Sequence, residues 1–221
     1  MLAPASECSE KPRPFSHTPA VRVDLHLHSH FSHDGQSSLD ELIQRCAECG
    51  LDRIALTDHN TVEGALALAK MAPVLAIIGE EAKTREGEVI GLFITGRIPP
   101  YLPPEEAMDM IHGMGGLTYL PHPLDRNRAH FRAERLVELA DRIDIIETYN
   151  AWCEPASNQA AARFAADLGK VSATGSDAHS ASELGRSWME IEDYASPQDF
   201  LEKLREARHV VTSSSGTGRR A

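Results

Sequence analysis

Short apolar segments recur along this chain, and stretches whose apolar residues lie three or four apart separate them. Segments of the first kind predict strands, and the longer periodic stretches predict helices. We predict strands at residues 21–28, 53–57, 74–78, 88–94, 117–120, 143–146, 171–174 and 188–191. We predict helices at residues 39–49, 61–71, 103–114, 133–140, 157–168 and 197–207. Ser38, with Glu41 three residues later, has the pattern of a capping box at the start of the first helix.

The alternation of strand and helix occurs about seven times, which predicts an α/β protein with a parallel sheet. Polar residues fall directly after at least six of the predicted strands. A doubly wound open sheet gathers its site at one switch point, whereas all the strand ends of a barrel converge on one face. We therefore expect a closed or nearly closed barrel with its site at the carboxyl ends of the strands.

The 221 residues suit one large domain, which we place at residues 21–212. Residues 1–20 hold four prolines among scattered polar residues and are expected to form a flexible lead-in. Residues 213–221 are rich in Ser and Gly and are expected to form a flexible tail.

Composition narrows the classes of partner. The formal net charge of −11 argues against a general nucleic-acid-coating surface, but not against a small phosphorylated substrate held by a few arginines. No apolar run approaches the ~20 residues of a membrane span, and we see no signal peptide.

Four cysteines are too few for a disulfide framework in this chain, so a reducing cytoplasm is expected. The CxxC of Cys46 and Cys49 lies late in a predicted helix, and we interpret it as ordinary helix cysteines. The oligomeric state stays open.

The segment Asp24–Ser29 (DLHLHS) ends the first predicted strand. Side chains alternate between the two faces of a strand, so Asp24, His26 and His28 are expected on one face. Leu25 and Leu27 are expected on the other face. Two neighbouring imidazoles with a carboxylate suit a transition metal.

Further His, Asp and Glu residues follow the other predicted strands. Together the candidate ligands are His26, His28, Asp34, His59, Glu81, Glu88, His122, Asp177 and His179. Because none is a cysteine, the set favours Zn, Mn or Fe with open positions over a closed structural zinc site. Nine ligands are too many for one ion and suit two or three divalent ions with a bridging carboxylate.

The chain resembles the PHP (polymerase and histidinol phosphatase) family of phosphoesterases. The matching motifs occur in the family's order and are DLHLHS (24–29), SHDG (32–35), TDHN (57–60), GEE (79–81), PHP (121–123) and GSDAH (175–179). The resemblance implies a distorted (βα)7 barrel with a di- or trinuclear metal site.

The resemblance also implies how the ligands are shared. His26, His28, Glu81 and Asp177 would hold one ion. Glu81 would bridge to a second ion, shared with Glu88 and His122, and Asp34, His59 and His179 would hold a third. Family members often have His where Glu88 stands, which leaves the metal's identity open. The loop offers both His33 and Asp34, and we prefer Asp34. Asp24 and Asp58 are interpreted as hydrogen-bond partners that orient imidazoles.

Arg126, Arg128 and Arg186 are candidate ligands for a substrate phosphate, because a guanidinium matches phosphate geometry. The resemblance places phosphate-binding arginines near the PHP tripeptide. The alternative is that they are surface residues of loops.

These observations predict a metal-dependent phosphoesterase that hydrolyses a phosphate monoester or a small nucleotide by attack of a metal-bridging hydroxide. An amidohydrolase-like C–N hydrolase on a similar barrel is one alternative. A non-catalytic, regulatory metal-binding module is another. The physiological substrate and the general acid stay open.

Overall fold

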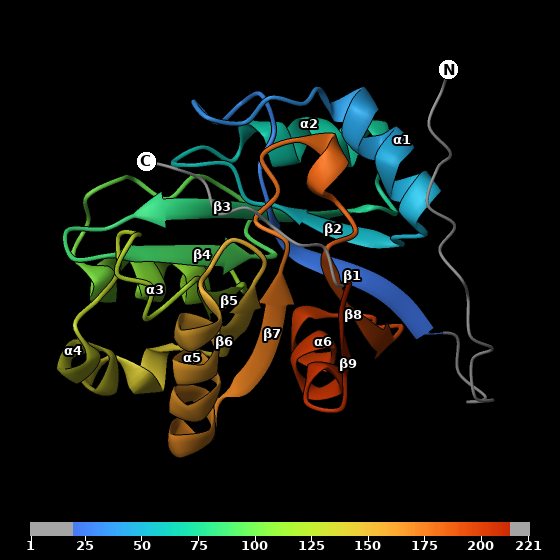
Figure 1. Cartoon of the computed structure of the whole chain (residues 1–221). Coiled ribbons are helices and arrows are strands. Elements are labelled where there is room, and N and C mark those ends of the chain that lie inside the picture. Colours follow the sequence, from blue (N-terminus) through green and yellow to red (C-terminus); the bar gives the residue numbers. More distant parts are fainter. Residues whose placement is uncertain (1–19, 213–221) are drawn as a thin grey trace.

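The computed structural model describes residues 20–212, so the predicted lead-in and tail lie outside the described residues, apart from Ala20. The described chain forms one mixed sheet with helices packed around it (Figure 1). The strands are β1 (Ala20–Leu27), β2 (Arg53–Leu56), β3 (Ala76–Lys83), β4 (Glu88–Leu92), β5 (Leu117–Leu120), β6 (Ile145–Asn150), β7 (Val171–Gly175), β8 (Ser187–Glu192) and β9 (Arg208–Val211). Their order in the sheet is β7-β6-β5-β4-β3-β2-β1-β8-β9.

Strand direction departs from the all-parallel prediction at β4 and again at β8 and β9, because β8 is antiparallel to β1 and β9 is antiparallel to β8. β1, β2 and β3 pair in parallel, as do β5, β6 and β7. β4 lies between these two groups and is antiparallel to both neighbours. Only residues 84–87 separate β3 from β4, and a parallel connection needs a crossover of a dozen or more residues. The chain must therefore reverse at this point, and the sheet is distorted.

The sheet nearly closes into a barrel at the carboxyl ends of β1 and β7. Leu27 and Ala178 form a parallel bridge. The Asp177 amide donates to the His26 carbonyl at 2.7 Å, and the His28 amide donates to the Ala178 carbonyl at 2.8 Å. The predicted α/β barrel is confirmed. The edge strand β7 meets the interior strand β1 through the segments that carry four of the candidate ligands, and β8 and β9 continue the sheet beyond β1.

The helices are α1 (Leu39–Cys49), α2 (Glu63–Met71), α3 (Pro104–Gly113), α4 (Ala133–Glu138), α5 (Pro155–Leu168) and α6 (Pro197–Leu204), with 3-10 turns η1 (Ala140–Arg142) and η2 (Ala181–Glu183). In Figure 1, α1 and α2 lie above the strands, and α3 to α6 lie below them. The predicted α1 has the observed bounds, because the Ser38–Glu41 capping box and the left-handed Gly50 mark its two ends. Within residues 20–212, no helix is long and apolar enough to cross a membrane.

Buried apolar side chains form two clusters. The inner cluster draws on strands β1 to β8 and on α6, and it includes Leu25, Ile77 and Tyr119. The outer cluster lies between the strands and helices α1 to α5, and it includes Leu27 and Leu56. The inner cluster fills the barrel below the ends of the strands that carry the candidate ligands. The buried polar residues of the candidate site therefore lie above this cluster.

β3, β6 and β9 differ most from the predicted strands. The sixth strand was predicted at residues 143–146, yet β6 runs from Ile145 to Asn150 and contains Glu147. The third was predicted at residues 74–78, yet β3 runs from Ala76 to Lys83, because its second half pairs with β4. Glu81 therefore lies within a strand and not after it. β9 was not predicted; its four residues are mostly exposed and lack an apolar pattern. It pairs with β8 at the edge of the sheet.

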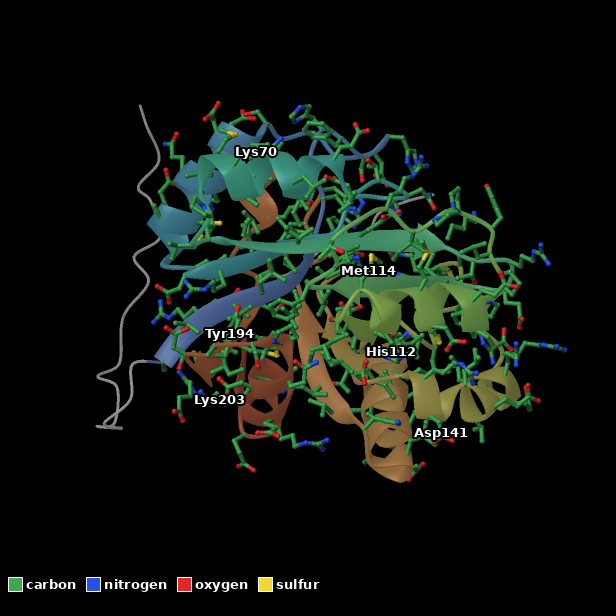
Figure 2. The ribbon with its side chains drawn as sticks, turned by 180° about the vertical axis from the view of Figure 1, so that it is seen from behind. Lys70, His112, Met114, Asp141, Tyr194 and Lys203 are labelled. Atoms are coloured by element: carbon green, nitrogen blue, oxygen red, sulfur yellow. The ribbon has the colours of Figure 1, made fainter. Side chains whose placement is uncertain are left out.

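We predict that His112 makes the stability of the fold depend on pH. Its Nε2 atom lies 2.8 Å from Asp144 Oδ2, at the end of α3 beside β5 (Figure 2). The hydrogen bond that His112 Nε2–H donates to the Asp144 carboxylate, opposed by partial burial, raises the pKa of His112 above its ordinary value. Because the folded-state pKa lies above the unfolded-state pKa, the stabilisation is present below the ordinary histidine value of about 6.5 and is lost as pH rises through the folded-state pKa.

Denaturant unfolding of the parent and of His112→Gln at a series of pH values measures this effect. The free energy of unfolding should be higher for the parent than for the variant. This difference should be largest near pH ~5.5 and should shrink toward pH ~9. A difference that stays constant or grows with pH would show that the pair is not coupled to folding.

Candidate metal centre

β1 ends in two histidines, and an irregularity in the strand sets where they point. The pairing of β1 with β2 shifts between Asp24 and Leu27. Leu25 packs in the inner cluster, whereas Leu27 packs in the outer one, so the predicted common face of these two residues is wrong. A β-bulge explains the change, because it interrupts the alternation of side chains. Bulges are frequent beside active sites for this reason.

Four donor atoms from β1, β3 and the turn after β7 meet beside the bulge: His26 Nε2, His28 Nε2, Glu81 Oε2 and Asp177 Oδ1. The two imidazole nitrogens are 3.2 Å apart. The Glu81 oxygen lies 3.2 Å from the nitrogen of His26 and 3.3 Å from that of His28. The Asp177 oxygen lies 3.5 Å and 3.3 Å from the same two nitrogens. All four side chains are buried.

This spacing fits one small cation. Four tetrahedral ligands at zinc bond lengths of roughly 2.0–2.1 Å lie about 3.3–3.4 Å from one another, and the five distances above bracket this value. Among the described residues, Asp177 Oδ1 is buried and has no hydrogen-bond partner. An acceptor of this kind beside two imidazole nitrogens would be completed by a divalent transition metal.

A second group of donors lies beside the first. His179 Nε2 is 3.1 Å and His59 Nε2 is 3.6 Å from Asp34 Oδ2. The other ring nitrogen of His179, Nδ1, donates to the Asp177 carbonyl at 2.8 Å, which leaves Nε2 as the lone-pair atom. The side chain of His33 is 80% exposed, and it lies 3.9 Å from Asp34. These contacts favour Asp34 over His33 as the loop ligand.

Glu81 connects these groups to His122 and Glu88. Its Oε1 atom lies 3.1 Å from His122 Nε2, while its Oε2 atom lies 3.2 Å from His59 Nδ1. Glu88 falls in one potential ligand group with His59 and Glu81, and His122 falls in another with His26 and Glu81. Glu88 and His122 were predicted to share one ion. They fall in different potential ligand groups, and Glu81 is the residue that these two groups have in common. Burial and the charge of Glu81 raise the pKa of Glu88, a repulsion that a cation would relieve.

The candidate ligands differ in protonation. Burial lowers the pKa of His26, His59 and His122, but the neighbouring carboxylates outweigh burial and raise all three values, that of His59 to about 9. A cation would therefore have to displace protons from these imidazoles. Burial raises the pKa of Glu81 and of Asp177, but the neighbouring imidazoles outweigh burial and hold both values well below the ordinary range. Burial lowers the pKa of His28 to about 4, so its imidazole is neutral at pH 7. Ionised carboxylates and neutral imidazoles are the forms that bind metals.

Asp24 and Asp58 do not contact imidazoles as expected. Asp24 accepts hydrogen bonds from the amides of His26, at 3.3 Å, and Ser176, at 3.0 Å. Asp58 accepts from the amide and hydroxyl of Ser29 at 2.7 and 2.8 Å. Both carboxylates hold backbone turns at the strand ends. The tertiary structure explains the difference, because it brings the amides of Ser29 and Ser176, from distant segments, against these carboxylates in place of imidazole rings.

Glu147 is the buried acceptor that sequence reasoning missed. Its Oε1 atom lies 3.0 Å from His26 Nδ1 and accepts from the Tyr119 hydroxyl at 2.8 Å. Its Oε2 atom accepts from the His122 amide at 2.7 Å and from the Asn150 side chain at 2.9 Å. The sequence does point to Glu147, because this residue directly follows the strand predicted at residues 143–146. Its role could not be read from one sequence, since all its partners but Asn150 are distant along the chain.

Three residues at strand ends have backbone conformations that L-residues rarely adopt. Asn60, His122 and Asp177 have positive φ angles of 56°, 28° and 50°. Such conformations cost free energy and cluster at functional sites, where the surrounding contacts enforce them. Here they follow β2, β5 and β7, and they turn the backbone directly beside the donor cluster.

The three candidate arginines lie in different surroundings. Arg128 Nη2 is 2.7 Å from Asp177 Oδ2, the oxygen that faces away from the histidines. Arg126 is exposed and lines a cavity of about 710 Å³ between the loop that follows β5 and the start of α5. Arg186 lies over the ring of Trp152 at 4.8 Å. Among the described contacts, only that of Arg128 joins one of these arginines to the donor cluster.

A family model described as the PHP domain matches residues 24–173, and a PHP-associated model matches residues 155–209. The first match spans β1 to β7, so it contains every candidate ligand except Asp177 and His179. Those two lie within the second match.

Relatives and solved structures agree with this assignment. An uncharacterized protein of Methanocaldococcus jannaschii is 35% identical over 199 residues, which is 84% of this chain and 79% of the relative. A protein of Thermotoga maritima named as a probable histidinol-phosphatase is 28% identical over 207 residues, or 76% of this chain and 89% of the relative. A crystal structure of a two-domain protein from Bacteroides vulgatus, described as containing a predicted PHP-like metal-dependent phosphoesterase, superposes with a TM-score of 0.77 at 18% identity. That match covers 94% of this chain and 70% of the other.

Proposed function

We propose that this chain, which belongs to the PHP domain family, is a metal-dependent phosphoesterase that hydrolyses a phosphate monoester or a small nucleotide. The observation that carries the proposal is the cluster of four buried donor atoms with the Arg128 guanidinium at its edge. The donors suit hard or borderline cations, and the guanidinium suits a phosphate. Few other small substrates call for both features in one site.

The site would hold two or three divalent ions of Mn, Zn or Fe. His26, His28, Glu81 and Asp177 would hold one ion. Glu81 would also face a second ion with His122 and Glu88. Asp34, His59 and His179 would hold a third. When bound, such ions polarise a phosphoryl oxygen and lower the pKa of water, which then attacks phosphorus and releases inorganic phosphate and an alcohol.

The chain's own residues would position the substrate. Asp177 uses one oxygen toward the histidines and the other toward Arg128, so the guanidinium is held beside the cluster. The arginine side chain is 26% exposed, so part of it faces solvent where a phosphate could arrive. Arg126, on the same loop, would meet the substrate farther out. These contacts support a phosphoester, because its phosphoryl group is itself anionic, whereas a C–N hydrolase substrate offers an arginine an anion only where it carries a carboxylate or phosphate elsewhere.

We predict more than one transition-metal ion per chain. Three of the four potential ligand groups contain at least one residue that is outside the four-donor cluster, so a single ion would leave buried donors unsatisfied. Elemental analysis of protein purified without chelator measures the stoichiometry. A reproducible value at or below one ion per chain would exclude the multinuclear site.

We predict that Glu81→Gln abolishes most phosphate release. The change keeps the shape of the side chain but removes the charge that faces both His26 and His122. Activity should fall by at least ~10²-fold, because an ion-held reacting group would be disturbed. The assay is a screen of phosphorylated metabolites with Mn²⁺, Zn²⁺ and Fe²⁺ reconstituted separately.

Glu80→Gln is the matched control for this experiment. Glu80 is a buried neighbour whose Oε2 atom accepts from the Ile98 amide, and it makes no contact with an imidazole. Its change should leave turnover within a few-fold of the parent. Equal activity of Glu81→Gln and the parent would reject Glu81 as a bridging ligand. Hydrolysis of amides but of no phosphoester would favour the C–N hydrolase instead.

We predict that Arg128→Ala and Arg126→Ala each lower kcat/KM for phosphoesters. A charge-assisted hydrogen bond contributes about 1.5–3 kcal/mol, or roughly 10- to 150-fold, if the contact persists in the transition state. Inhibition by inorganic phosphate should weaken in parallel. Arg163→Ala is the control, because Arg163 is exposed on α5 and does not line the cavity that Arg126 lines.

Metal content must be measured in each of these variants. Arg128 contacts Asp177, so its loss affects a candidate ligand, whereas Arg126 makes no such contact. If neither single variant nor the double variant changes kcat/KM by more than about twofold while the metals stay bound, the arginines do not bind substrate.

A further inference from the structure

Glu147 is a fully buried carboxylate that accepts from four donors on three segments of the barrel. The His122 amide and the Asn150 side-chain nitrogen can only donate, and both point at Oε2. The Tyr119 hydroxyl and His26 Nδ1 point at Oε1. With its acceptor positions used in this way, the carboxylate requires a proton on His26 Nδ1.

This contact decides which nitrogen of His26 is free. With the proton on Nδ1, the lone pair of the neutral ring lies on Nε2, the atom that faces His28, Glu81 and Asp177. The opposite tautomer would aim an N–H bond at the centre of the cluster and exclude a cation. The tautomer of His26 is therefore set by a residue outside the cluster.

The same carboxylate reaches the other donors. It holds the His122 amide, at the residue with a φ of 28°, and so fixes the turn that directs this imidazole toward Glu81. Asn150 donates to Glu147 at 2.9 Å and lies 3.3 Å from Asp177 Oδ2. Three candidate ligands are thus connected through one side chain.

Close packing leaves Glu147 little freedom to move. A Cβ atom at Gly175 would lie 2.3 Å from Glu147 Oε1 and 2.5 Å from His26 Cβ. Only glycine fits between these two side chains, so the backbone of β7 packs directly against both the carboxylate and the imidazole.

We propose that Glu147 is a positioning residue that holds His26 in the Nδ1–H tautomer and joins the His26, His122 and Asp177 parts of the metal centre into one rigid unit. The proposal rests on the proposed function, because it assigns these three residues to metal binding. Glu147 itself need not touch an ion or a substrate.

Glu147→Gln tests the proposal, because an amide cannot satisfy all four donors. If its nitrogen faces His26, the ring must move its proton to Nε2. If its nitrogen faces the His122 amide and Asn150, buried donors oppose one another and the His122 turn shifts. Either arrangement should weaken Zn²⁺ binding, measured by chelator competition, by roughly 10–100-fold.

Nuclear magnetic resonance of the zinc-loaded protein reads the tautomer directly. In the parent, His26 should show a slowly exchanging Nδ1–H and a zinc-bound Nε2. In saturated Glu147→Gln, the Nδ1–H signal should be lost or exchange rapidly if the amide nitrogen faces His26. If the amide oxygen faces His26, the signal should stay, and the weakened zinc affinity is then the result that tests the proposal. Zinc on Nδ1 of the parent would overturn the proposal, even if the variant fails to fold.

Two controls separate positioning from a structural role. Tyr119→Phe removes one donor to the same carboxylate, so it should lower stability but keep the Nδ1–H signal and zinc affinity. Glu80→Gln neutralises another buried carboxylate and should change neither the Nδ1–H signal of His26 nor the zinc affinity. Unchanged affinity and tautomer in folded Glu147→Gln would reject the proposal alone, whereas a parent that binds no divalent ion would reject the proposed function.

Discussion

The constraint on which the structure depends is the burial of several carboxylates within one small volume. Glu81, Asp177 and Glu147 are almost completely inaccessible to water. A buried carboxylate is costly unless it is paired and hydrogen-bonded. The chain meets this requirement with imidazoles, one guanidinium and backbone amides, and a set of bound cations would complete the compensation. Each strand end near the barrel mouth contributes to this balance.

Closure of the sheet and assembly of the site are the same structural event. The end of the edge strand β7 meets the end of β1 through hydrogen bonds between the backbone at His26 and His28 and the backbone at Asp177 and Ala178. These segments also carry the donor atoms, so the distance between the strand ends sets the distance between ligands. The left-handed φ of Asp177 and the bulge in β1 are local departures from regular structure that this meeting requires.

The buried surroundings divide the polar residues into groups with different tasks. Some carboxylates, such as Asp24 and Asp58, hold backbone turns and leave the imidazoles untouched. Others face the imidazoles directly. Glu147 does both, because one oxygen meets His26 and the other meets the His122 amide. The residue types are the same in each group. Only their contacts distinguish the carboxylates that hold the backbone from those that face the imidazoles.

The sequence by itself determined the alternation of elements, the bounds of α1 and the set of candidate ligands, because these depend on local periodicity, capping and residues next to strand ends. The tertiary structure decided the direction of β4, the extension of β3 through Glu81 and the opposite faces of Leu25 and Leu27. It also decided that the Asp34 carboxylate lies between His59 and His179 while His33 stays largely exposed, and that Glu147 reaches His26 across the barrel. Pairing partners and hydrogen bonds between residues far apart in the chain set these features, and no local pattern in one sequence encodes them.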